Sequence, residues 1–406
     1  MLEGIRILDC ASWIAGPCAG TIASDFGAEV IKIEPPGSGD SYRRKFSNVY
    51  YAPQDCYDYP WFVDARNKSS LTLNLKSDEG QEILSKLLKT ADVLITNMPL
   101  RARGRLKLTY ADIKAVKPDI IYASLTPFGE DGPYANDKGF DSSSFWARSG
   151  LMDCLRGRHD KPRGSLVGQG DHSTAAALFG GIMLALFDRE RTGEGRMVCT
   201  SLLHNGIWSN AVSVQGGSTL PWFESSQWDV GVVRLMRSAT QYVTSDGGII
   251  LFDMIDTEDE FCRFLDILGI KDELTAHPAY KPLNKSAPVV FRDESELIDI
   301  VQRAVMGRTR DDLLKAALER GVTLVWVNKI TEVKDDPQVL ANEMIKDIDA
   351  DVFGVGKIVD SPLFLSGAKK EIRSKAPEIG QHTDEILKSI GYPDEEIKKL
   401  REQRIV

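Results

Sequence analysis

Asp171 is the residue whose surroundings are best suited to covalent chemistry. It lies in the sequence GQGDHSTA, where Gly168 and Gly170 precede it and a long apolar stretch predicts a helix after it. A helix N-terminus stabilises an ionised carboxylate, and flanking glycines let a substrate approach the backbone closely. Such a carboxylate could attack a carbonyl carbon while free backbone N–H groups stabilise the oxyanion. An Asp that only caps the helix would occupy the same position, so the local sequence leaves both interpretations open.

A second group of residues is suited to a phosphorylated ligand. Arg101, Arg103, Arg105 and Lys107 follow residues 92–97, an apolar stretch that predicts a buried strand. Cations at the carboxyl end of a parallel strand are well placed to bind phosphate. A solvated basic loop has the same composition, and both interpretations stand.

The segment AGPCAG, residues 15–20, follows the first predicted strand and only partly matches a nucleotide-binding turn. A dinucleotide-binding motif needs G-x-G-x-x-G here and an acidic residue about 20 positions later. Glu34 lies at a suitable distance, but the glycines are wrongly spaced. A nicotinamide-dependent oxidoreductase is therefore a weak alternative. His172 adjoins Asp171, but adjacent side chains usually point apart, so we do not expect the two to share a catalytic role.

Alternating strand and helix patterns must position these residues. Strands are expected at residues 5–10, 28–34, 70–75, 92–97 and 120–125, with helices between several of them. This alternation predicts an open, mostly parallel α/β sheet with ligands at the carboxyl ends of its strands.

The chain is long enough for more than one core. Residues 211–247 are rich in Gly, Ser and Trp and are expected to form a loop, after which strands and amphipathic helices resume. We expect a large α/β domain, a small domain with linkers and a C-terminal segment returning to the large domain, in residues 1–210, 211–325 and 326–406.

The composition excludes two classes of partner. The chain has 406 residues, 42% of them hydrophobic and 27% charged, with a formal net charge of −9. This acidic surplus argues against nucleic acid, and no apolar run reaches the roughly 20 residues of a membrane span. We expect no signal peptide. The six cysteines form no C-x-x-C pair and the five histidines are scattered, so we expect reduced thiols, a cytoplasmic location and no metal.

Together these stretches resemble the family III CoA-transferases, which include formyl-CoA transferase, carnitine CoA-transferase and the α-methylacyl-CoA racemases. The likeness covers nearly the whole chain. Its motifs are LEGIRILDCASWIAGPCAG, AEVIKIEPPGSGD, NKSSLTLNLKSDEG, DVLITNMP, GFD, GQGD, RTGEGRMVCTSLL, DDPQVLANEM, SPLFLSG and GQHTDEILKSIGY. Each motif alone is weak, but their order and spacing identify the family.

The resemblance implies an enzyme that moves CoA from an acyl-CoA to a free carboxylic acid without a prosthetic group. Asp171 matches the family's catalytic Asp, which carries the acyl group as an anhydride and then becomes a thioester. The implied fold is a Rossmann-like large domain with a smaller α/β domain, and two chains interlock as a homodimer. The implied CoA contacts are Ala15 and Gly16 near the thiol end, Asn97, Arg105 and Lys138.

Three departures from the family pattern matter. Pro35 stands where some members carry an Arg for the nucleotide, so we expect Arg43 or Arg44 to supply that contact. The Gly-rich loop that shields intermediates in formyl-CoA transferase is missing, and GGS at residues 216–218 is a poor substitute. Phe140 replaces the His of the racemases' G-H-D motif and cannot take a proton. A racemase or epimerase, or a non-catalytic CoA-binding protein, remains the alternative.

The motifs GFDSSSFWARSG, GQGDHSTA and SLLHNGIWSN most closely resemble the branch that activates 2-hydroxy acids. Aromatic residues in the long loop and beyond it could line an apolar pocket for medium or aromatic acids. Packing of the loop and of a dimer contact would explain them equally well. These residues are Tyr50, Tyr51, Tyr57, Tyr59, Trp61, Trp208 and Trp222.

Overall fold

The chain folds into two compact units. The computed structural model describes residues 1–43, 58–156, 161–162, 164–220, 241–252, 257–282 and 295–406. The first unit contains Met1–Asp153, Arg163–Val214 and Glu343–Val406, and the second contains Cys154–Pro162 and Gln215–Asn342. The sequence predicted that the small domain begins after residue 210 and ends at residue 325. In the structure the main part of the second unit begins after Val214 and ends at Asn342.

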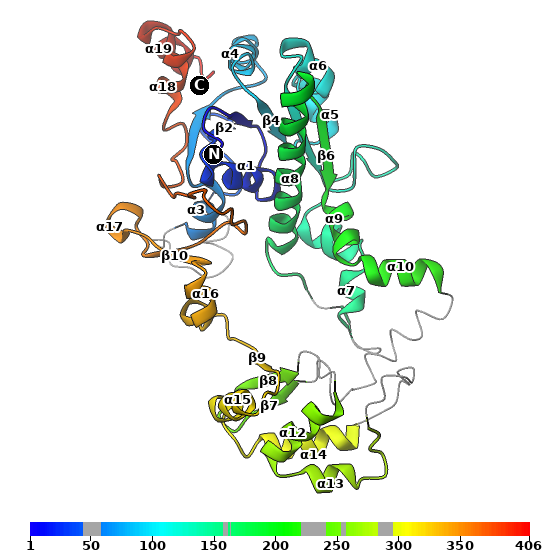
Figure 1. Ribbon diagram of the computed structural model, residues 1–406. Coiled ribbons are helices and arrows are strands. Elements are labelled where there is room, and N and C mark those ends of the chain that lie inside the picture. Colours follow the sequence, from blue (N-terminus) through cyan, green and yellow to red (C-terminus); the bar gives the residue numbers. More distant parts are fainter. Residues whose placement is uncertain (44–57, 157–160, 163, 221–240, 253–256, 283–294) are drawn as a thin grey trace. The chain divides into compact units, whose positions relative to one another are not determined.

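A six-stranded sheet forms the centre of the first unit, in the order β3-β2-β1-β4-β5-β6 (Figure 1). All of its strand pairs are parallel, which confirms the predicted α/β sheet. The strand order reverses between β1 and β4, and ligands of such sheets bind beyond the carboxyl ends at that point. The strands are β1 Arg6–Asp9, β2 Glu29–Glu34, β3 Lys68–Thr72, β4 Val93–Thr96, β5 Ile121–Thr126 and β6 Met197–Ser201. The sequence did not predict β6.

Each face of this sheet carries its own hydrophobic core. In β1, Ile7 belongs to the core shared with α1 (Ala15–Asp25) and α8 (Gln169–Thr192). Leu8 belongs to the opposite core, shared with α4 (Asp78–Leu88). Burial on both faces explains why these strands are apolar runs rather than alternating ones. The remaining elements of the sheet's surroundings are α3 Tyr59–Ala65, α5 Leu100–Arg105, α6 Tyr110–Val116, the π-helix η1 Asp141–Ala147, α7 Leu151–Cys154, α9 Leu202–Ser209, α18 Thr383–Ser389 and α19 Asp394–Glu402.

One segment of the predicted loop is helical. α10 covers Ala211–Thr219, where the sequence analysis expected irregular backbone. Two glycines and several β-branched or hydroxyl residues lower its helix propensity, which is why the sequence concealed it. The helix nevertheless forms directly after α9, and the N–H of Val214 donates to the carbonyl of Asn210.

The chain re-enters the first unit at Glu343 and forms a two-stranded sheet with a short helix between its strands. These elements are β10 Ile345–Asp347, α17 Ala350–Phe353 and β11 Lys357–Val359.

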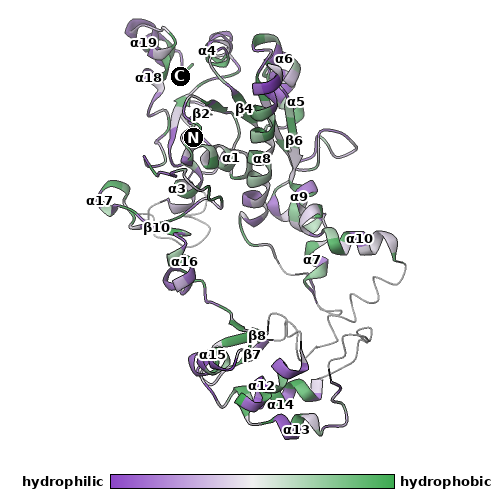
Figure 2. Cartoon of the chain, in the orientation of Figure 1, coloured by the Kyte–Doolittle hydropathy of each residue, from purple (hydrophilic) through white to green (hydrophobic). Residues whose placement is uncertain are grey.

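The second unit pairs a small antiparallel sheet with amphipathic helices. Its strands are β7 Gln241–Val243, β8 Ile249–Phe252 and β9 Leu324–Trp326. The amphipathic helices expected after residue 247 are present, and the first of them, α12, Glu258–Leu268, buries Phe261 and Phe264. Figure 2 shows polar and apolar residues side by side on α12 and α14. The other helical segments are α13 Lys271–Thr275, α14 Ser295–Val305, α15 Arg310–Glu319, the 3-10 turn η2 Val333–Asp335 and α16 Pro337–Ala341.

The described helices include none with the length and apolar character needed to cross a membrane.

Candidate active site

Asp171 lies in the first turn of α8, beyond the carboxyl edge of the sheet. Gly168 is the N-cap residue and adopts a left-handed φ of 74°, a conformation that favours glycine. The Asp171 side chain is partly exposed, and no described residue donates a hydrogen bond to its carboxylate. The carboxylate is therefore accessible and lacks the partners that stabilise a structural Asp.

Asp141, from the GFD motif, provides the cap that the sequence allowed for Asp171. Its Oδ2 accepts a hydrogen bond from the N–H of Gly170 at 3.2 Å. A Cβ atom on Gly170 would lie 2.2 Å from Asp141 Oδ1 and 2.4 Å from Phe145 Cγ, so this close approach requires glycine. The interpretation of Asp171 as the helix cap is wrong, because another carboxylate occupies that role from a different helix.

Burial raises the pKa of Asp171 to about 7, and the nearby carboxylates of Asp141 and Asp64 add to the rise while His172 opposes it. The pKa of Asp141 is also raised, because burial outweighs the amides that face it. A carboxylate with a pKa near neutrality is more basic than an ordinary Asp, which makes it a stronger nucleophile when ionised. A perturbed group of this kind in a cleft is a functional-site candidate.

His172 faces Asp64 in a short network that the sequence did not reveal. Its Nε2 lies 2.8 Å from Asp64 Oδ1, and Tyr42 donates to Asp64 Oδ2 at 2.8 Å. Burial alone would lower the pKa of His172, but the Asp64 carboxylate raises it. The Asp64 carboxylate thus favours the protonated form of the imidazole beside Asp171, and the ring is engaged with Asp64 rather than free as an acid–base partner.

Cys18 adjoins the same network. Ligand atoms of Cys18, Asp64 and His172 lie within 4.8 Å of one another, a spacing that the sequence did not reveal and that could hold a metal ion. Burial raises the pKa of the Cys18 thiol well above its usual range, and a neutral thiol is a poor metal ligand. Since Asp64 already accepts from Tyr42, the contacts favour a hydrogen-bonded network over a metal centre.

A buried ion network holds the loop between β1 and α1. Lys32 Nζ lies 2.8 Å from Asp40 and 3.7 Å from Asp9, and Lys68 Nζ lies 3.0 Å from Asp9. Asp40 also accepts from the N–H of Trp13 at 3.0 Å. Burial on its own raises the pKa of Asp9, but Lys32 and Lys68 hold it below its usual value. These paired charges fix the backbone just before α1.

Ala15 and Gly16, the predicted contacts of the CoA thiol end, form the start of α1. A Cβ atom on Gly16 would lie 2.6 Å from Ala11 Cβ, so the loop packs tightly there. Ile14, the N-cap of α1, lies 3.3 Å from the position of a Cβ atom on Gly168. The N-termini of α1 and α8 therefore approach each other. The amides at the start of α8 face Asp141, whereas the N–H groups of Ala15 and Gly16 have no partner within α1, as in the first turn of any helix.

Asn97 and Arg43 are committed to contacts within the protein. The Asn97 side chain exchanges two hydrogen bonds with the backbone of Ser12, at 2.7 and 2.8 Å, and so positions the β1 loop. Arg43 donates twice to Glu34, at 2.8 and 2.6 Å, and once to the Pro377 carbonyl at 2.8 Å. These contacts argue against Arg43 as the replacement for the nucleotide contact missing at Pro35. Arg44 lies outside the described residues.

The basic residues after β4 divide into two kinds. Arg103 is buried, pairs with Glu130 at 2.9 Å and is therefore structural. Arg105 is exposed, as is Lys138, and neither pairs with a carboxylate among the described residues. Both side chains are thus available to an anionic ligand, and their assignment to CoA remains a prediction.

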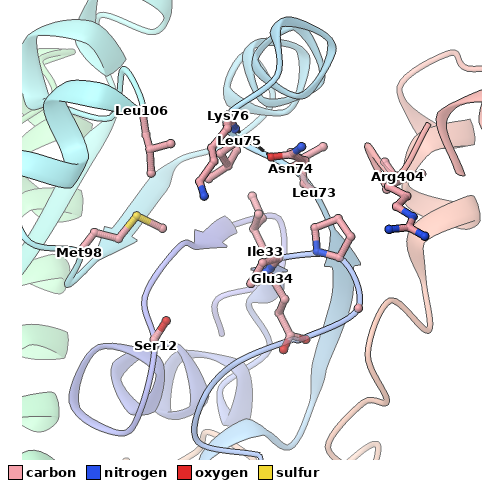
Figure 3. A pocket seen from close by; sticks show the side chains of 14 residues that line it. Ser12, Ile33, Glu34, Leu73, Asn74, Leu75, Lys76, Met98, Leu106 and Arg404 are labelled. Carbon is pink, nitrogen blue, oxygen red and sulfur yellow. Dashed lines mark hydrogen bonds between the residues drawn. The ribbon is translucent and has the colours of Figure 1, made fainter.

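A cavity of about 720 Å³ opens at the carboxyl ends of β1 to β4. Apolar side chains such as Ile33 and Met98 line it together with the cations Lys76 and Arg404 (Figure 3). Sequence reasoning missed both cations. Lys76 could have been found from its place after a predicted strand, whereas nothing in the sequence linked Arg404 to this edge of the sheet.

The predicted aromatic acyl pocket falls largely on Tyr50, Tyr51, Tyr57 and Trp222, which lie outside the described residues. Among the others, Trp61 is buried beneath the Arg43 guanidinium, which lies 4.0 Å from the ring centre. Tyr59 and Trp208 are exposed, at 49% and 76%. Trp61 therefore serves packing, and the acyl pocket remains a prediction.

Comparison with known proteins identifies relatives along the whole chain. The model of CoA-transferase family III matches residues 2–383. The (R)-2-hydroxy-4-methylpentanoate CoA-transferase of Clostridioides difficile is 29% identical, covering 100% of this chain and 99% of that protein. The cinnamoyl-CoA:phenyllactate CoA-transferase of Clostridium sporogenes is 28% identical, covering 100% and 97%. A crystal structure of a CAIB/BAIF family protein from Brucella suis superposes with a TM-score of 0.79 and 26% identity, covering 96% and 99%.

Proposed function

The chain belongs to CoA-transferase family III and is a CoA-transferase, and we propose that Asp171 is the carboxylate that carries the acyl group. One observation carries this proposal. Asp171 is a partly exposed carboxylate to which no described residue donates a hydrogen bond, and burial raises its pKa to about 7. It lies at the N-terminus of α8, close to the N-terminus of α1. That combination gives a basic nucleophile next to groups able to stabilise an oxyanion.

The reaction requires four displacements at carbonyl carbon. The Asp171 carboxylate attacks the donor thioester, so that a C–O bond forms, the C–S bond breaks and CoA leaves as a thiolate. The thiolate then attacks the Asp171 carbonyl of the mixed anhydride, releasing the donor acid and leaving an aspartyl thioester. The acceptor carboxylate attacks this thioester and expels the thiolate again. Attack of the thiolate on the acceptor carbonyl finally forms the new acyl-CoA and restores Asp171.

The surroundings of Asp171 account for the energetics of these steps. Each tetrahedral intermediate bears an oxyanion, which the first-turn N–H groups of α1 can stabilise, because those of α8 face Asp141. His172, whose protonated form Asp64 favours, lowers the pKa of Asp171 and so keeps more of it ionised near neutrality. Asp141 occupies the Gly170 amide and leaves the Asp171 side chain free to react.

Substitution of the nucleophile tests the mechanism. Asp171→Asn and Asp171→Ala should lower transfer by at least about 10⁴-fold, because no anhydride can form. Asp188→Asn is a matched control on the same helix, since Asp188 pairs with Arg196 at the exposed far end of α8. Wild-type protein incubated with acyl-CoA and hydroxylamine should acquire a hydroxamate at Asp171, detected by peptide mass spectrometry. Normal turnover by Asp171→Ala would disprove the mechanism.

We place the CoA nucleotide in the cavity at the ends of β1 to β4. The cavity has the volume of a small-molecule site and combines apolar walls with the cations Lys76 and Arg404. Its Ser12 wall belongs to the loop that leads to Ala15 and Gly16, so the pantetheine arm can run from the cavity toward Asp171. Arg105 and Lys138 are exposed cations that could contact the phosphates from outside.

For the acids, we propose 2-hydroxy acids with aliphatic or aromatic side chains. The support comes from the relatives named for 2-hydroxy-4-methylpentanoate and phenyllactate, both matched along the whole chain. Medium and aromatic acids should exceed formate and oxalate as acceptors by at least about tenfold in kcat/KM, because an apolar pocket gains about 0.8 kcal/mol per buried methylene. A panel of acids incubated with one acyl-CoA and analysed by mass spectrometry measures this. Equal use of oxalate would contradict the assignment.

The quaternary structure and location are also proposed. An interlocked homodimer would cover large apolar side chains that the first unit exposes, among them Leu184, Phe187, Trp208 and Val212. Light scattering should give twice 45.0 kDa without a monomer on dilution, and a stable monomer would contradict it. A cytoplasmic location agrees with the acyl-CoA substrate and with the free thiols of Cys10, Cys18, Cys199 and Cys262.

A further inference from the structure

The cavity at the sheet edge receives a residue from the far end of the sequence. Arg404 follows α19 and reaches the cavity wall opposite Ser12, as Figure 3 shows. Its side chain is exposed, and no described carboxylate pairs with it. Arg404 is therefore a cation at a cavity rim whose side chain has no partner among the described residues.

The backbone around Arg404 is firmly held. The N–H of Asn74 donates to the Ile405 carbonyl at 2.7 Å, and the side chains of Ile405 and Val406 are buried in the core below. Arg404 itself has a φ of 57°, in the left-handed region that residues with a side chain rarely occupy. Contacts on its C-terminal side and α19 before it maintain this conformation, which keeps Arg404 at the rim of the cavity.

The carboxylate in the cavity wall, Glu34, already has partners that neutralise its charge. Glu34 lines the cavity, but both of its oxygens accept from Arg43, and they also accept from Ser70 and from the N–H of Asp40. Lys76, like Arg404, has no described partner. The cavity thus presents two available cations and a neutralised carboxylate, which suits a ligand with several negative charges.

The direction of the ligand follows from the position of Asp171. Ser12 lies in the same loop as Ile14, which approaches Gly168 at the start of α8. The Ser12 side of the cavity is therefore the side from which the pantetheine arm must leave. In CoA the charged group farthest along the molecule from the thiol is the 3′-phosphate of the ribose, and Arg404 stands on the far side of the cavity.

We propose that Arg404 binds the 3′-phosphate of CoA and allows the enzyme to distinguish CoA from 3′-dephospho-CoA. This role rests on the proposed function, because it places the CoA nucleotide in this cavity. A planar guanidinium can donate two parallel hydrogen bonds to a phosphate, which a Lys cannot do. Arg404 thereby supplies the phosphate contact that Arg43, engaged with Glu34, does not offer.

Calorimetric titration with CoA and with 3′-dephospho-CoA tests the assignment without any need for turnover. The wild-type protein should bind CoA about tenfold more tightly than 3′-dephospho-CoA, and Arg404→Gln should remove this difference by weakening CoA alone. Arg401→Gln is the matched control, because Arg401 lies in α19 and pairs with Asp384 on the surface. It should leave both affinities unchanged.

Two results would overturn the proposal. Equal weakening of both ligands by Arg404→Gln would show a structural or diphosphate role, and unchanged affinities would show no role. Arg404→Lys, which keeps the charge and the backbone conformation, provides a second variant and should retain part of the preference for CoA. A failure of Asp171 chemistry would appear in transfer assays and leave these titrations intact, so the two proposals fail independently.

Discussion

Two regions at the carboxyl edge of the same sheet shift the pKa of a carboxyl group in opposite directions. Beneath the β1 loop, Asp9 lies between Lys32 and Lys68, and these cations hold the pKa of the buried carboxyl below its usual value against the effect of burial. At the start of α8, Asp171 has only the half-exposed His172 to oppose burial and two neighbouring carboxylates, and burial raises its pKa to about 7.

The difference separates positioning from chemistry. A carboxylate surrounded by cations is stable and unreactive, so the β1 loop is held rigidly but performs no reaction. A carboxylate without hydrogen-bond donors is destabilised when ionised, and that free energy becomes available when it forms a covalent bond. The rigid region supports the reactive one, because the loop before α1 faces the start of α8.

The largest expected effect is the loss of stability when a cation is removed from the ion network beneath the β1 loop. Lys32→Met leaves the buried carboxylates of Asp9 and Asp40 without their shared partner, which should lower the free energy of unfolding by about 3–5 kcal/mol. Chemical denaturation measures it. Lys388→Met, which removes an exposed ion pair with Asp394, should cost at most about 0.5 kcal/mol. Equal stability of the two variants would show that the network does not hold the loop.

Disturbing the contact between the two carboxylate-bearing helices should rank second. Gly170→Ala places a Cβ atom 2.2 Å from Asp141 Oδ1, and we expect a loss of about 1–3 kcal/mol in stability and at least about tenfold in kcat. Gly180→Ala, in the same helix, meets nothing within 4 Å. It should be neutral or stabilising by about 0.5–1 kcal/mol. If both variants behaved alike, Asp141 would not be positioning the start of α8.

The pH dependence of transfer should reveal the perturbed carboxylate. Because Asp171 must be ionised to attack, kcat/KM should fall about tenfold per pH unit below its pKa of about 7. His172 opposes the shift, whereas Asp141 and Asp64 support it, so His172→Gln should move the midpoint upward. Initial rates from about pH 5 to 9 measure both profiles. A wild-type midpoint near the ordinary Asp value of about 4 would contradict the comparison between the two regions.

The smallest expected effect is a pH-dependent change in thermal stability when Asp171 is replaced. A carboxyl whose folded-state pKa is raised destabilises the fold once it ionises, so the cost is absent below the unfolded-state pKa and complete above the folded-state value. Asp171→Asn should therefore raise Tm by about 1–3 °C at about pH 8 and leave it unchanged at about pH 4. Differential scanning calorimetry at both pH values decides this. A lower Tm for the variant at both would indicate a structural role for Asp171.

The sequence by itself determined the elements and the candidate nucleophile. Apolar runs alternating with amphipathic patterns predicted five of the parallel strands, and GQGD located Asp171 at the start of a helix. These features depend on local periodicity and on capping chemistry, which neighbouring residues decide among themselves. For the same reason the low helix propensity of Ala211–Thr219 predicted a loop where the structure has a helix.

Only the tertiary structure decided how the charged groups are shared. Arg43 and Arg404 look alike in sequence, yet Glu34 engages Arg43, whereas Arg404 stands at the cavity rim without a partner in the described part of the chain. Likewise, local reasoning could not assign the cap of α8 to Asp141 or the contact of His172 to Asp64. Partners that are far apart along the chain meet only after the sheet and its helices have packed, so the availability of a charged side chain is a property of the fold.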